Sequence, residues 1–251
     1  MRELEGKTAL VTGASRGIGA ATAIALARAG ARRLLIHYHS NPEGAERVRA
    51  AVTAAGAEAT LHQADLGAVA GIRSLAADIR PVPVDILVNN AGSLVQRASL
   101  AEFTEELFDR VMNLNVKSAY FITQAVAPGM IERGGGCIVN VSSIAARNGG
   151  GPGATIYAAA KAAVSCMTKG VAKELAPKGV RVNGVSPGTV DNDFHARFST
   201  REMLARMAAS TPAGRLGTNE EVADVIVFLC SHAARYIYGQ TIEINGGMLM
   251  V

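Results

Sequence analysis

The chain has 251 residues, 49% of them hydrophobic and 18% charged, so it can bury a sizeable core and is not a disordered chain. Its 25 basic and 21 acidic residues give a formal net charge of +4, but the basic residues are spread along the sequence, which argues against a nucleic-acid partner. The three cysteines have no CxxC spacing and the five histidines have no ligand spacing, so we expect neither disulfides nor a metal site.

Short apolar runs rich in β-branched residues alternate with longer helical patterns along the whole chain. The expected strands are Thr8–Val11, Arg33–His37, Ala57–Gln63, Val84–Val88, Cys137–Val141, Arg181–Val185 and Thr241–Ile244. The expected helices are Ile18–Ala29, Pro42–Ala55, Val69–Ile79, Thr104–Ala127, Tyr157–Leu175 and Asn219–Leu229. This alternation is typical of a parallel sheet with helices on both faces. We predict one α/β domain over residues 1–251, with a doubly wound sheet of about seven strands.

Two stretches bear on location and on the substrate. The N-terminal Met1–Lys7 is charged and no apolar run could span a bilayer, so we expect a soluble, cytoplasmic protein without a membrane partner. The polar segment Gly188–Gly217 interrupts the alternation, and segments of this length are often lids. Its apolar residues are expected to shape a substrate pocket, although ordinary packing would also explain them: Phe194, Phe198, Met203, Leu204 and Met207.

A glycine-rich turn follows the first strand and opens the first helix. Backbone N–H groups and the helix dipole favour an anion at such a helix N-terminus, and glycine lets a pyrophosphate approach the backbone closely. A glycine-rich turn can also be purely structural, but this position between a strand and a helix favours a dinucleotide site. The candidate contacts in the turn are Gly13, Ser15, Arg16, Gly17, Ile18 and Gly19.

With further motifs, this turn resembles the short-chain dehydrogenase/reductase family. Its spacing matches the family's TGxxxGxG loop, Asn89–Gly92 matches NNAG, and Tyr157 with Lys161 matches YxxxK. Ser143 and Asn115 match the catalytic serine and asparagine. The remaining matches are the turn Pro187–Gly188 and the C-terminal segment 239–247. The resemblance covers essentially the whole chain and implies a Rossmann-type fold, a nicotinamide cofactor and hydride transfer.

The residues after the second strand indicate which nicotinamide cofactor is used. An acidic residue there would bind the free ribose hydroxyls of NAD and repel the 2′-phosphate of NADP. This chain has no acid at that point: Tyr38 takes its place, followed by His39 and Ser40, which could donate hydrogen bonds. Arg16 lies where similar family members place a cation against the 2′-phosphate, although it could also be a solvated cation. We therefore predict NADP(H) in preference to NAD(H).

The resemblance implies further cofactor contacts after the third, fourth and sixth strands. Asp65 should contact the adenine with Leu66 packed nearby, although Asp65 could instead cap the next helix. Where the family commonly has threonine, this chain has Asn192. The other expected contacts lie at the ribose, at the turn and at the carboxamide: Asn89, Ala91, Gly92, Pro187, Gly188 and Val190.

Tyr157 and Lys161 are four residues apart on a predicted helix, so their side chains share one face. Such a pair alone more often lies on a solvent-exposed helix face without a catalytic role, but here it occurs with two cofactor motifs. A nearby ammonium lowers the pKa of a phenol, which is ordinarily about 10. Lys161 could also bind the nicotinamide ribose. Ser143 could donate to the substrate oxygen, with Ser142 as an alternative donor, and the resemblance implies that Asn115 holds a water beside Lys161.

The whole sequence looks most like 3-oxoacyl-acyl-carrier-protein reductases, which implies reduction of a β-keto group, with Tyr157 as the general acid. An alcohol or sugar dehydrogenase working oxidatively and a non-catalytic, cofactor-binding regulator are the alternatives. An acyl carrier protein could dock at Lys178, although Gly134 stands at the second docking position, next to Arg133. The resemblance also suggests a homotetramer.

Overall fold

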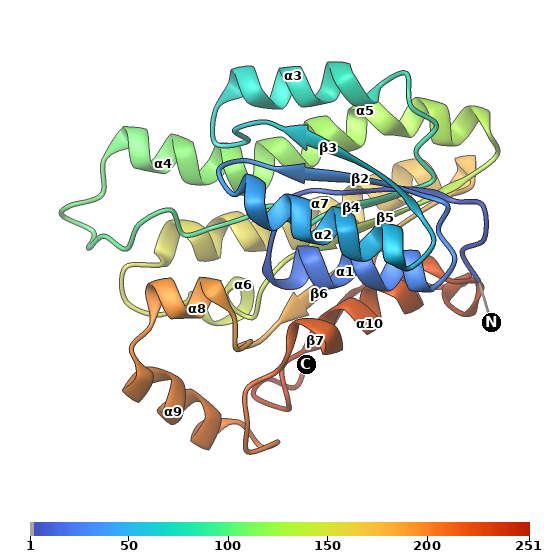
Figure 1. Ribbon diagram of the computed structural model, residues 1–251. Coiled ribbons are helices and arrows are strands. Elements are labelled where there is room, and N and C mark those ends of the chain that lie inside the picture. Colours follow the sequence, from blue (N-terminus) through green and yellow to red (C-terminus); the bar gives the residue numbers. More distant parts are fainter. Residues whose placement is uncertain (1–2) are drawn as a thin grey trace.

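Seven parallel strands form one sheet in the part of the chain that the computed structural model describes, residues 3–251 (Figure 1). The strands are β1 Thr8–Val11, β2 Arg33–Tyr38, β3 Glu58–Gln63, β4 Ile86–Asn89, β5 Gly136–Val141, β6 Val180–Pro187 and β7 Thr241–Ile244. Their order in the sheet is β3-β2-β1-β4-β5-β6-β7. This confirms the predicted doubly wound α/β sheet, a topology in which ligands bind where the order reverses, here between β1 and β4.

Helices cover both faces of the sheet. The α-helices are α1 Gly17–Arg28, α2 Pro42–Ala54, α3 Val69–Ile79, α4 Glu105–Met112, α5 Ser118–Glu132, α6 Ala145–Asn148, α7 Thr155–Leu175, α8 Asp193–Phe198, α9 Arg201–Ser210 and α10 Asn219–Cys230. Three short helices of other types are the π-helix η1 Asn113–Lys117 and the 3-10 helices η2 Ala176–Lys178 and η3 His232–Ala234. The helices α1, α2 and α10 lie on one face of the sheet, and α3, α5 and α7 lie on the other (Figure 1).

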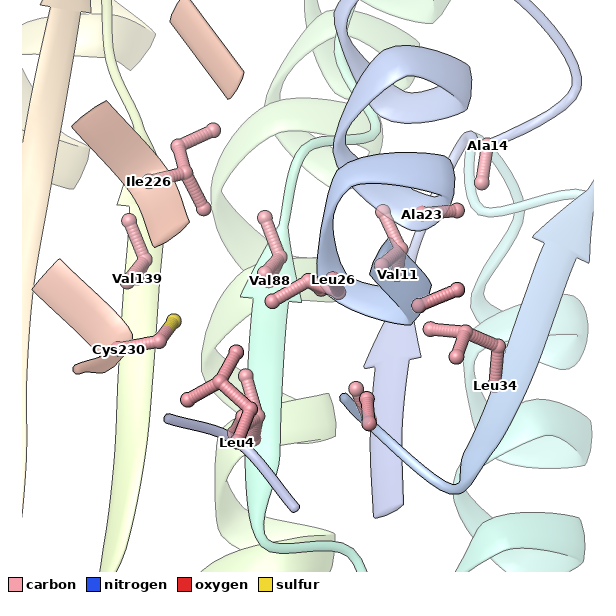
Figure 2. Packing of buried hydrophobic residues seen from close by; sticks show 14 of the residues in the cluster. Leu4, Val11, Ala14, Ala23, Leu26, Leu34, Val88, Val139, Ile226 and Cys230 are labelled. Carbon is pink, nitrogen blue, oxygen red and sulfur yellow. The ribbon is translucent and has the colours of Figure 1, made fainter. Parts of the chain in front are cut away.

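The two faces of the sheet hold two hydrophobic cores. Successive strand residues point to opposite faces, so Val11 of β1 enters one core and Leu10 enters the other. Figure 2 shows the first core, where strand side chains meet α1 and α10 through Val11, Val88, Val139, Leu26 and Ile226. Each fully buried aliphatic side chain of this size contributes about 2 kcal/mol to folding. Burial on both faces keeps the strand ends, and thus the site, in place.

The segment predicted as one helix over 104–127 has three parts in the structure. Helix α4 begins after Thr104, whose side chain accepts a hydrogen bond from the Leu107 N–H at 3.2 Å. The wider π-turn η1 then interrupts the α-helical pattern, and α5 continues past Pro128 to Glu132. Asn115 lies at the centre of the π-turn, and such turns are frequent at functional sites.

The predicted lid, Gly188–Gly217, contains two short helices, α8 and α9. Asn192 caps α8 by accepting hydrogen bonds from two backbone N–H groups, and Thr200 caps α9 by accepting one from the Met203 N–H. The two ends of the lid meet in a parallel bridge between Val190 and Gly217. Among the described residues, no helix is both long and apolar enough to cross a membrane.

Candidate active site

A cavity of about 840 Å³ opens at the carboxyl ends of the strands, between the glycine-rich turn and the lid. The structure brings most of the predicted site residues to its wall. Three of the four predicted catalytic residues line it: Ser143, Tyr157 and Lys161. The predicted cofactor contacts that line it are Gly13, Ser15, Arg16, Gly17, Ile18, His39, Ser40, Asp65, Leu66, Ala91, Gly92, Pro187, Gly188 and Val190. Four predicted residues lie outside the lining: Gly19, Tyr38, Asn89 and Asn115.

The glycine-rich turn is tied to the turn after β4. The Asn90 side-chain amide donates to the carbonyl oxygens of Thr12 at 2.8 Å and Gly13 at 3.1 Å. In return, the Thr12 hydroxyl oxygen accepts from the backbone N–H groups of Asn90 and Ala91, both at 3.0 Å. The sequence interpretation assigned no role to Thr12 or Asn90, although Asn90 belongs to the recognised NNAG motif. These bonds fix the distance between β1 and β4, where the sheet order reverses.

Two glycines of the turn are required by its geometry. Gly13 has a φ of +64°, and a Cβ at this position would lie 2.9 Å from the Ala91 Cα. Gly19 is buried in α1, and a Cβ there would lie 2.5 Å from the Gly13 carbonyl oxygen. Gly19 therefore lets the helix approach the turn, whereas Gly13 and Gly17 border the cavity itself. A backbone cradle at a helix N-terminus fits the pyrophosphate of a dinucleotide.

His37, in β2, is hydrogen-bonded to the same glycine-rich turn. Its Nδ1 accepts a hydrogen bond from the Gly13 N–H at 3.0 Å, and its Nε2 donates to the Ala64 carbonyl oxygen at 3.1 Å. This arrangement requires a neutral ring, because Nδ1 must carry a free lone pair. Burial accordingly lowers the pKa of His37 to about 4. The sequence interpretation missed this role.

We expect His37→Gln to remove a pH dependence of stability. The pKa of His37 is about 4 in the folded chain and 6.5 in the unfolded chain, so the unfolded chain binds more protons between these values and stability falls as the pH falls. The free-energy difference between wild type and His37→Gln should shrink by about 3 kcal/mol from pH 8 to pH 4. Denaturant unfolding of both proteins across this range measures it, and a constant difference would contradict the assignment.

At the end of the cavity nearest β2 and β3, Asp65 is held in a charged group of side chains. Its Oδ2 lies 3.1 Å from the Arg110 Nη2 and 3.8 Å from the His39 Nε2, and its Oδ1 accepts from the Gly67 N–H at 2.9 Å. Partial burial opposes ionisation, but the Gly67 hydrogen bond, the charge interaction with His39 and the Arg110 guanidinium outweigh it and lower the pKa of Asp65. The residue before α3 is Ala68, so Asp65 is not its N-cap.

Tyr38 does not border the cavity, whereas His37, His39 and Ser40 do. Successive side chains of a strand point in opposite directions, so the inward position of His37 turns Tyr38 away. Asn89 is also outside the lining: its side-chain amide donates to Asn140 Oδ1 at 2.9 Å and to Thr123 Oγ1 at 3.1 Å. Asn89 thus links β4, β5 and α5 behind the cavity.

Tyr157 and Lys161 lie one turn apart on α7 and both face the cavity. The Lys161 Nζ is 5.7 Å from the centroid of the Tyr157 ring and donates to the Val141 carbonyl oxygen at 2.7 Å. Lys161 is 4% exposed, and no carboxylate among the described residues forms an ion pair with it. Burial lowers the pKa of Lys161 to about 8, so its charge is poised near neutral pH.

The two serines at the end of β5 have different partners. Ser142 is buried, and its hydroxyl donates to the Lys161 carbonyl oxygen at 2.9 Å and lies 2.7 Å from the Ser165 hydroxyl. The Ser143 side chain borders the cavity beside Tyr157, lowers the pKa of this phenol, and accepts from the Ala145 N–H at 3.1 Å. Ser142 therefore anchors α7, while Ser143 is the serine beside the phenol.

The Tyr157 phenol is kept in its protonated form. The expectation that Lys161 lowers the pKa of Tyr157 is not met: burial raises this pKa to about 12, and Ser143 offsets the effect only in part. Part of the burial comes from the lid, where the Phe194 ring lies 5.8 Å from the Tyr157 ring between centroids. The site thus presents a proton donor and a buried cation side by side, which is an arrangement suited to proton transfer.

Asn115 lies behind Gly92, next to Lys161. Its side-chain amide donates to the carbonyl oxygens of Val111 at 2.8 Å and Ser93 at 2.9 Å, and its Oδ1 accepts from the Ser93 N–H at 3.2 Å. A Cβ on Gly92 would lie 2.7 Å from this Oδ1 and 2.8 Å from the Lys161 Nζ. Gly92 therefore leaves open the space that joins the two polar groups.

Comparison with known proteins agrees with this geometry. A family profile described as Enoyl-(Acyl carrier protein) reductase matches residues 13–249. The chain belongs to the short-chain dehydrogenase/reductase family. It is 38% identical to the 3-oxoacyl-[acyl-carrier-protein] reductase FabG of Vibrio harveyi, over 99% of both chains. It is an NAD(P)-dependent oxidoreductase by this membership.

Two solved structures of short-chain dehydrogenases/reductases are similar in fold and differ in cofactor. A candidate NAD(P)-dependent gluconate 5-dehydrogenase of Beutenbergia cavernae, with bound NADP, has a TM-score of 0.91 at 35% identity over 98% of both chains. A 7α-hydroxysteroid dehydrogenase complexed with NADH has a TM-score of 0.90 at 36% identity, over 98% of this chain and 95% of that one. Similarity alone thus does not select the cofactor.

The other end of the cavity in this short-chain dehydrogenase/reductase is formed by the lid and by the segment after β4. Of the lid residues predicted to shape it, Leu204 is outside the lining. Asn192, in place of the family's threonine, borders the cavity while it caps α8 and donates to the Asn219 Oδ1 at 3.0 Å. The lining residues not predicted from the sequence include Leu94, Val95, Arg97, His195 and Met248.

The residues considered for carrier docking lie elsewhere. Lys178 and Arg133 precede β6 and β5, so they are at the amino ends of strands whose carboxyl ends carry the cavity. Arg133 is also engaged: it donates to the Val84 carbonyl oxygen at 2.6 Å and lies 3.6 Å from the Asp85 carboxylate. Within one chain, these side chains and the cavity are on opposite edges of the sheet.

Proposed function

We propose that the protein reduces a ketone, β-ketoacyl-like or another small carbonyl compound, to an alcohol with NADPH. The observation that carries the proposal is that Tyr157, Ser143 and Lys161 share one cavity wall, with the Lys161 Nζ 5.7 Å from the centroid of the Tyr157 ring. A protonated phenol is the form needed to donate a proton to a carbonyl oxygen. Oxidation of an alcohol would use the same side chain as the general base, in its phenolate form.

The residues of the site have separate roles in this reaction. The bound cofactor would supply the hydride. Ser143 would donate a hydrogen bond to the carbonyl oxygen of the substrate as negative charge builds up there. Tyr157 would pass its phenolic proton to that oxygen, and the Lys161 cation would stabilise the resulting phenolate. Asn115 would keep the space behind Gly92 polar, so that a water could return the proton.

The preference for NADP(H) rests on the charges at the adenosine end. No carboxylate follows β2, and the one nearby carboxylate, Asp65, is paired with Arg110. Arg16 borders the cavity at the start of α1, is exposed, and forms no ion pair within the described residues. A free arginine at a helix N-terminus favours a phosphate over a hydroxyl.

We expect Arg16→Ser to raise the KM for NADPH by about tenfold while the KM for NADH changes little, because only NADPH carries the 2′-phosphate. Initial rates with each cofactor measure the effect. Arg28→Ser, at the exposed far end of the same helix, is the matched control and should leave both constants unchanged. Equal losses with the two cofactors would contradict the preference.

A substrate panel tests the proposed reaction: ketones are assayed with NADPH and with NADH, and the corresponding alcohols with NADP+ and with NAD+. We expect faster turnover in the reductive direction near neutral pH, with NADPH. Oxidation of an alcohol or sugar as the faster reaction would favour the dehydrogenase alternative. Cofactor binding without any turnover would favour a regulator.

We also propose that the protein is a cytoplasmic homotetramer. The α4 and α5 helices carry large apolar side chains that a single chain leaves exposed, including Phe108, Tyr120 and Phe121, between 43% and 45% accessible. Such a surface supports association between copies. Docking of an acyl carrier protein would then depend on how neighbouring copies bring Lys178 near a cavity.

A further inference from the structure

Arg97 lies at the substrate end of the cavity and is held in one orientation. Its Nε donates to the Phe198 carbonyl oxygen at 3.0 Å, and its Nη1 donates to the Pro152 carbonyl oxygen at 2.6 Å. Phe198 ends lid helix α8, and Pro152 precedes α7, so the guanidinium is fixed between two walls of the cavity. The Arg97 Nη2 makes no hydrogen bond to any described residue, although an arginine offers five N–H donors.

The charge of Arg97 is not neutralised by the protein. No carboxylate in the described part of the chain forms an ion pair with Arg97 or with Arg197. Arg197 stands nearby on α8, with its guanidinium 5.1 Å from the Phe198 ring centroid. Its Nη2 donates at 3.5 Å to the carbonyl oxygen of Val95, in the same segment as Arg97.

The two arginines border the outward continuation of the cavity. A groove of about 820 Å³, open to solvent, shares Arg97, Arg197, Phe198 and Met203 with the cavity that contains Tyr157. Of the residues that the structure describes, those lining this groove include no acidic side chain. A ligand that reaches from Tyr157 into the groove therefore passes two cations and meets no carboxylate from the groove wall.

The field of Arg97 extends into the cavity. His195 of α8 borders the cavity, and its ring lies 5.2 Å from the Phe194 ring, which in turn covers Tyr157. Burial, the charge of Arg97 and an opposing effect of Asp191 together lower the pKa of His195 to about 4. A neutral His195 can hydrogen-bond a substrate but does not supply charge. The positive charge at the end of the cavity that continues into the groove therefore comes from Arg97 and Arg197.

We propose that the ketone substrate carries an anionic group, a carboxylate or a phosphate, which Arg97 binds with help from Arg197. A fixed guanidinium with free N–H donors is suited to carboxylate and phosphate oxygens. The inference rests on the proposed function. The anionic group itself does not react: the carbonyl carbon accepts a hydride from NADPH, which becomes NADP+, and the carbonyl oxygen accepts the Tyr157 proton.

Matched substrate pairs test the inference and identify the source of the charge. The carboxylate arm compares keto acids of increasing chain length with their methyl esters, and the phosphate arm compares dihydroxyacetone phosphate with dihydroxyacetone. In at least one arm, kcat/KM should be about tenfold higher for the anion, and Arg97→Gln should abolish this advantage. Arg97→Lys should retain part of it, because the charge remains. Arg201→Gln, on the exposed side of α9, should leave it intact.

If Arg97 only held the lid in place, Arg97→Gln would lower the rates with neutral and anionic substrates equally, and such equal losses would overturn the inference. The absence of any preference for anions in the wild type would overturn it as well.

A binding measurement separates the anion site from the proposed function. Calorimetry of the NADPH complex should show that glutarate binds, that dimethyl glutarate does not, and that Arg97→Gln weakens glutarate about tenfold. Arg97-dependent glutarate binding without any carbonyl reduction would refute the proposed function alone, whereas reduction of neutral ketones without anion preference would refute the anion site alone.

Discussion

Tyr157→Phe is expected to lower kcat for ketone reduction by about a thousandfold, because it removes the only proton donor that we place at the substrate oxygen. The change deletes one hydroxyl group and leaves the ring against Phe194. Cofactor binding should therefore persist. Single-turnover oxidation of bound NADPH, followed by absorbance, measures the chemical step, and fluorescence titration measures the affinity for NADPH.

The control for this variant is Tyr236→Phe, at a side chain that is 95% exposed and does not line the cavity. It should leave kcat unchanged. If Tyr157→Phe retained more than about a tenth of the wild-type kcat, another group would have to supply the proton and the assignment would be wrong. A loss of thermal stability in Tyr157→Phe would point instead to a structural role.

Lys161→Met should lower kcat/KM by about a thousandfold and at the same time stabilise the protein. Activity falls because the phenolate formed at Tyr157 loses the nearby cation, and because a donor to the cofactor ribose is lost. Stability rises because the folded chain buries a charge that no carboxylate pairs. Lost function combined with gained stability is the expected signature of a residue kept for catalysis.

The sign of the pH dependence follows from the two pKa values of Lys161. The pKa of Lys161 is about 8 in the folded chain and 10.5 in the unfolded chain. Between these two pH values the unfolded chain binds more protons, so wild-type stability rises with pH across this range. The advantage of Lys161→Met should be about 2 kcal/mol at pH 7, after the loss of the bond to Val141, and should vanish near pH 10. Wild-type reduction should slow above about pH 8, where the cation is lost.

Denaturant unfolding at several pH values, together with pH–rate profiles, measures both effects. Lys169→Met, on the exposed side of the same helix, is the matched control and should change neither. Destabilisation of Lys161→Met at pH 7 would show that the bond to Val141 outweighs the cost of the buried charge, which would contradict the poised cation that we describe.

Residues in short, contiguous motifs at strand ends were the part of the site that the sequence predicted well. Gly13 and Ser143 reach the cavity because parallel strands place their carboxyl ends at one edge, whereas Tyr157 and Lys161 reach it from one face of α7. Whether these residues perform the proposed chemistry stays a prediction until the variants are measured.

Other positions depended on details that a sequence pattern does not contain. Tyr38 and His37 differ by one residue, and the register of β2 decides which of them faces the glycine-rich turn. His37 looked like an ordinary strand residue, since its role comes only from contact with Gly13. The π-turn around Asn115 was missed because a helical pattern over 104–127 looks continuous, and one widened turn leaves that pattern almost unchanged.

The bridge between Val190 and Gly217 has a consequence for how such enzymes diversify. It closes the base of the lid at a narrow neck, so the residues between Val190 and Gly217 form a cassette that begins and ends at the same place on the sheet edge. Because the entropic cost of a loop grows slowly with its length, the cassette can be lengthened, shortened or exchanged while the neck holds. New substrate ranges can then arise by replacing one module, and grafting at Val190 and Gly217 is the natural way to exchange specificity between relatives.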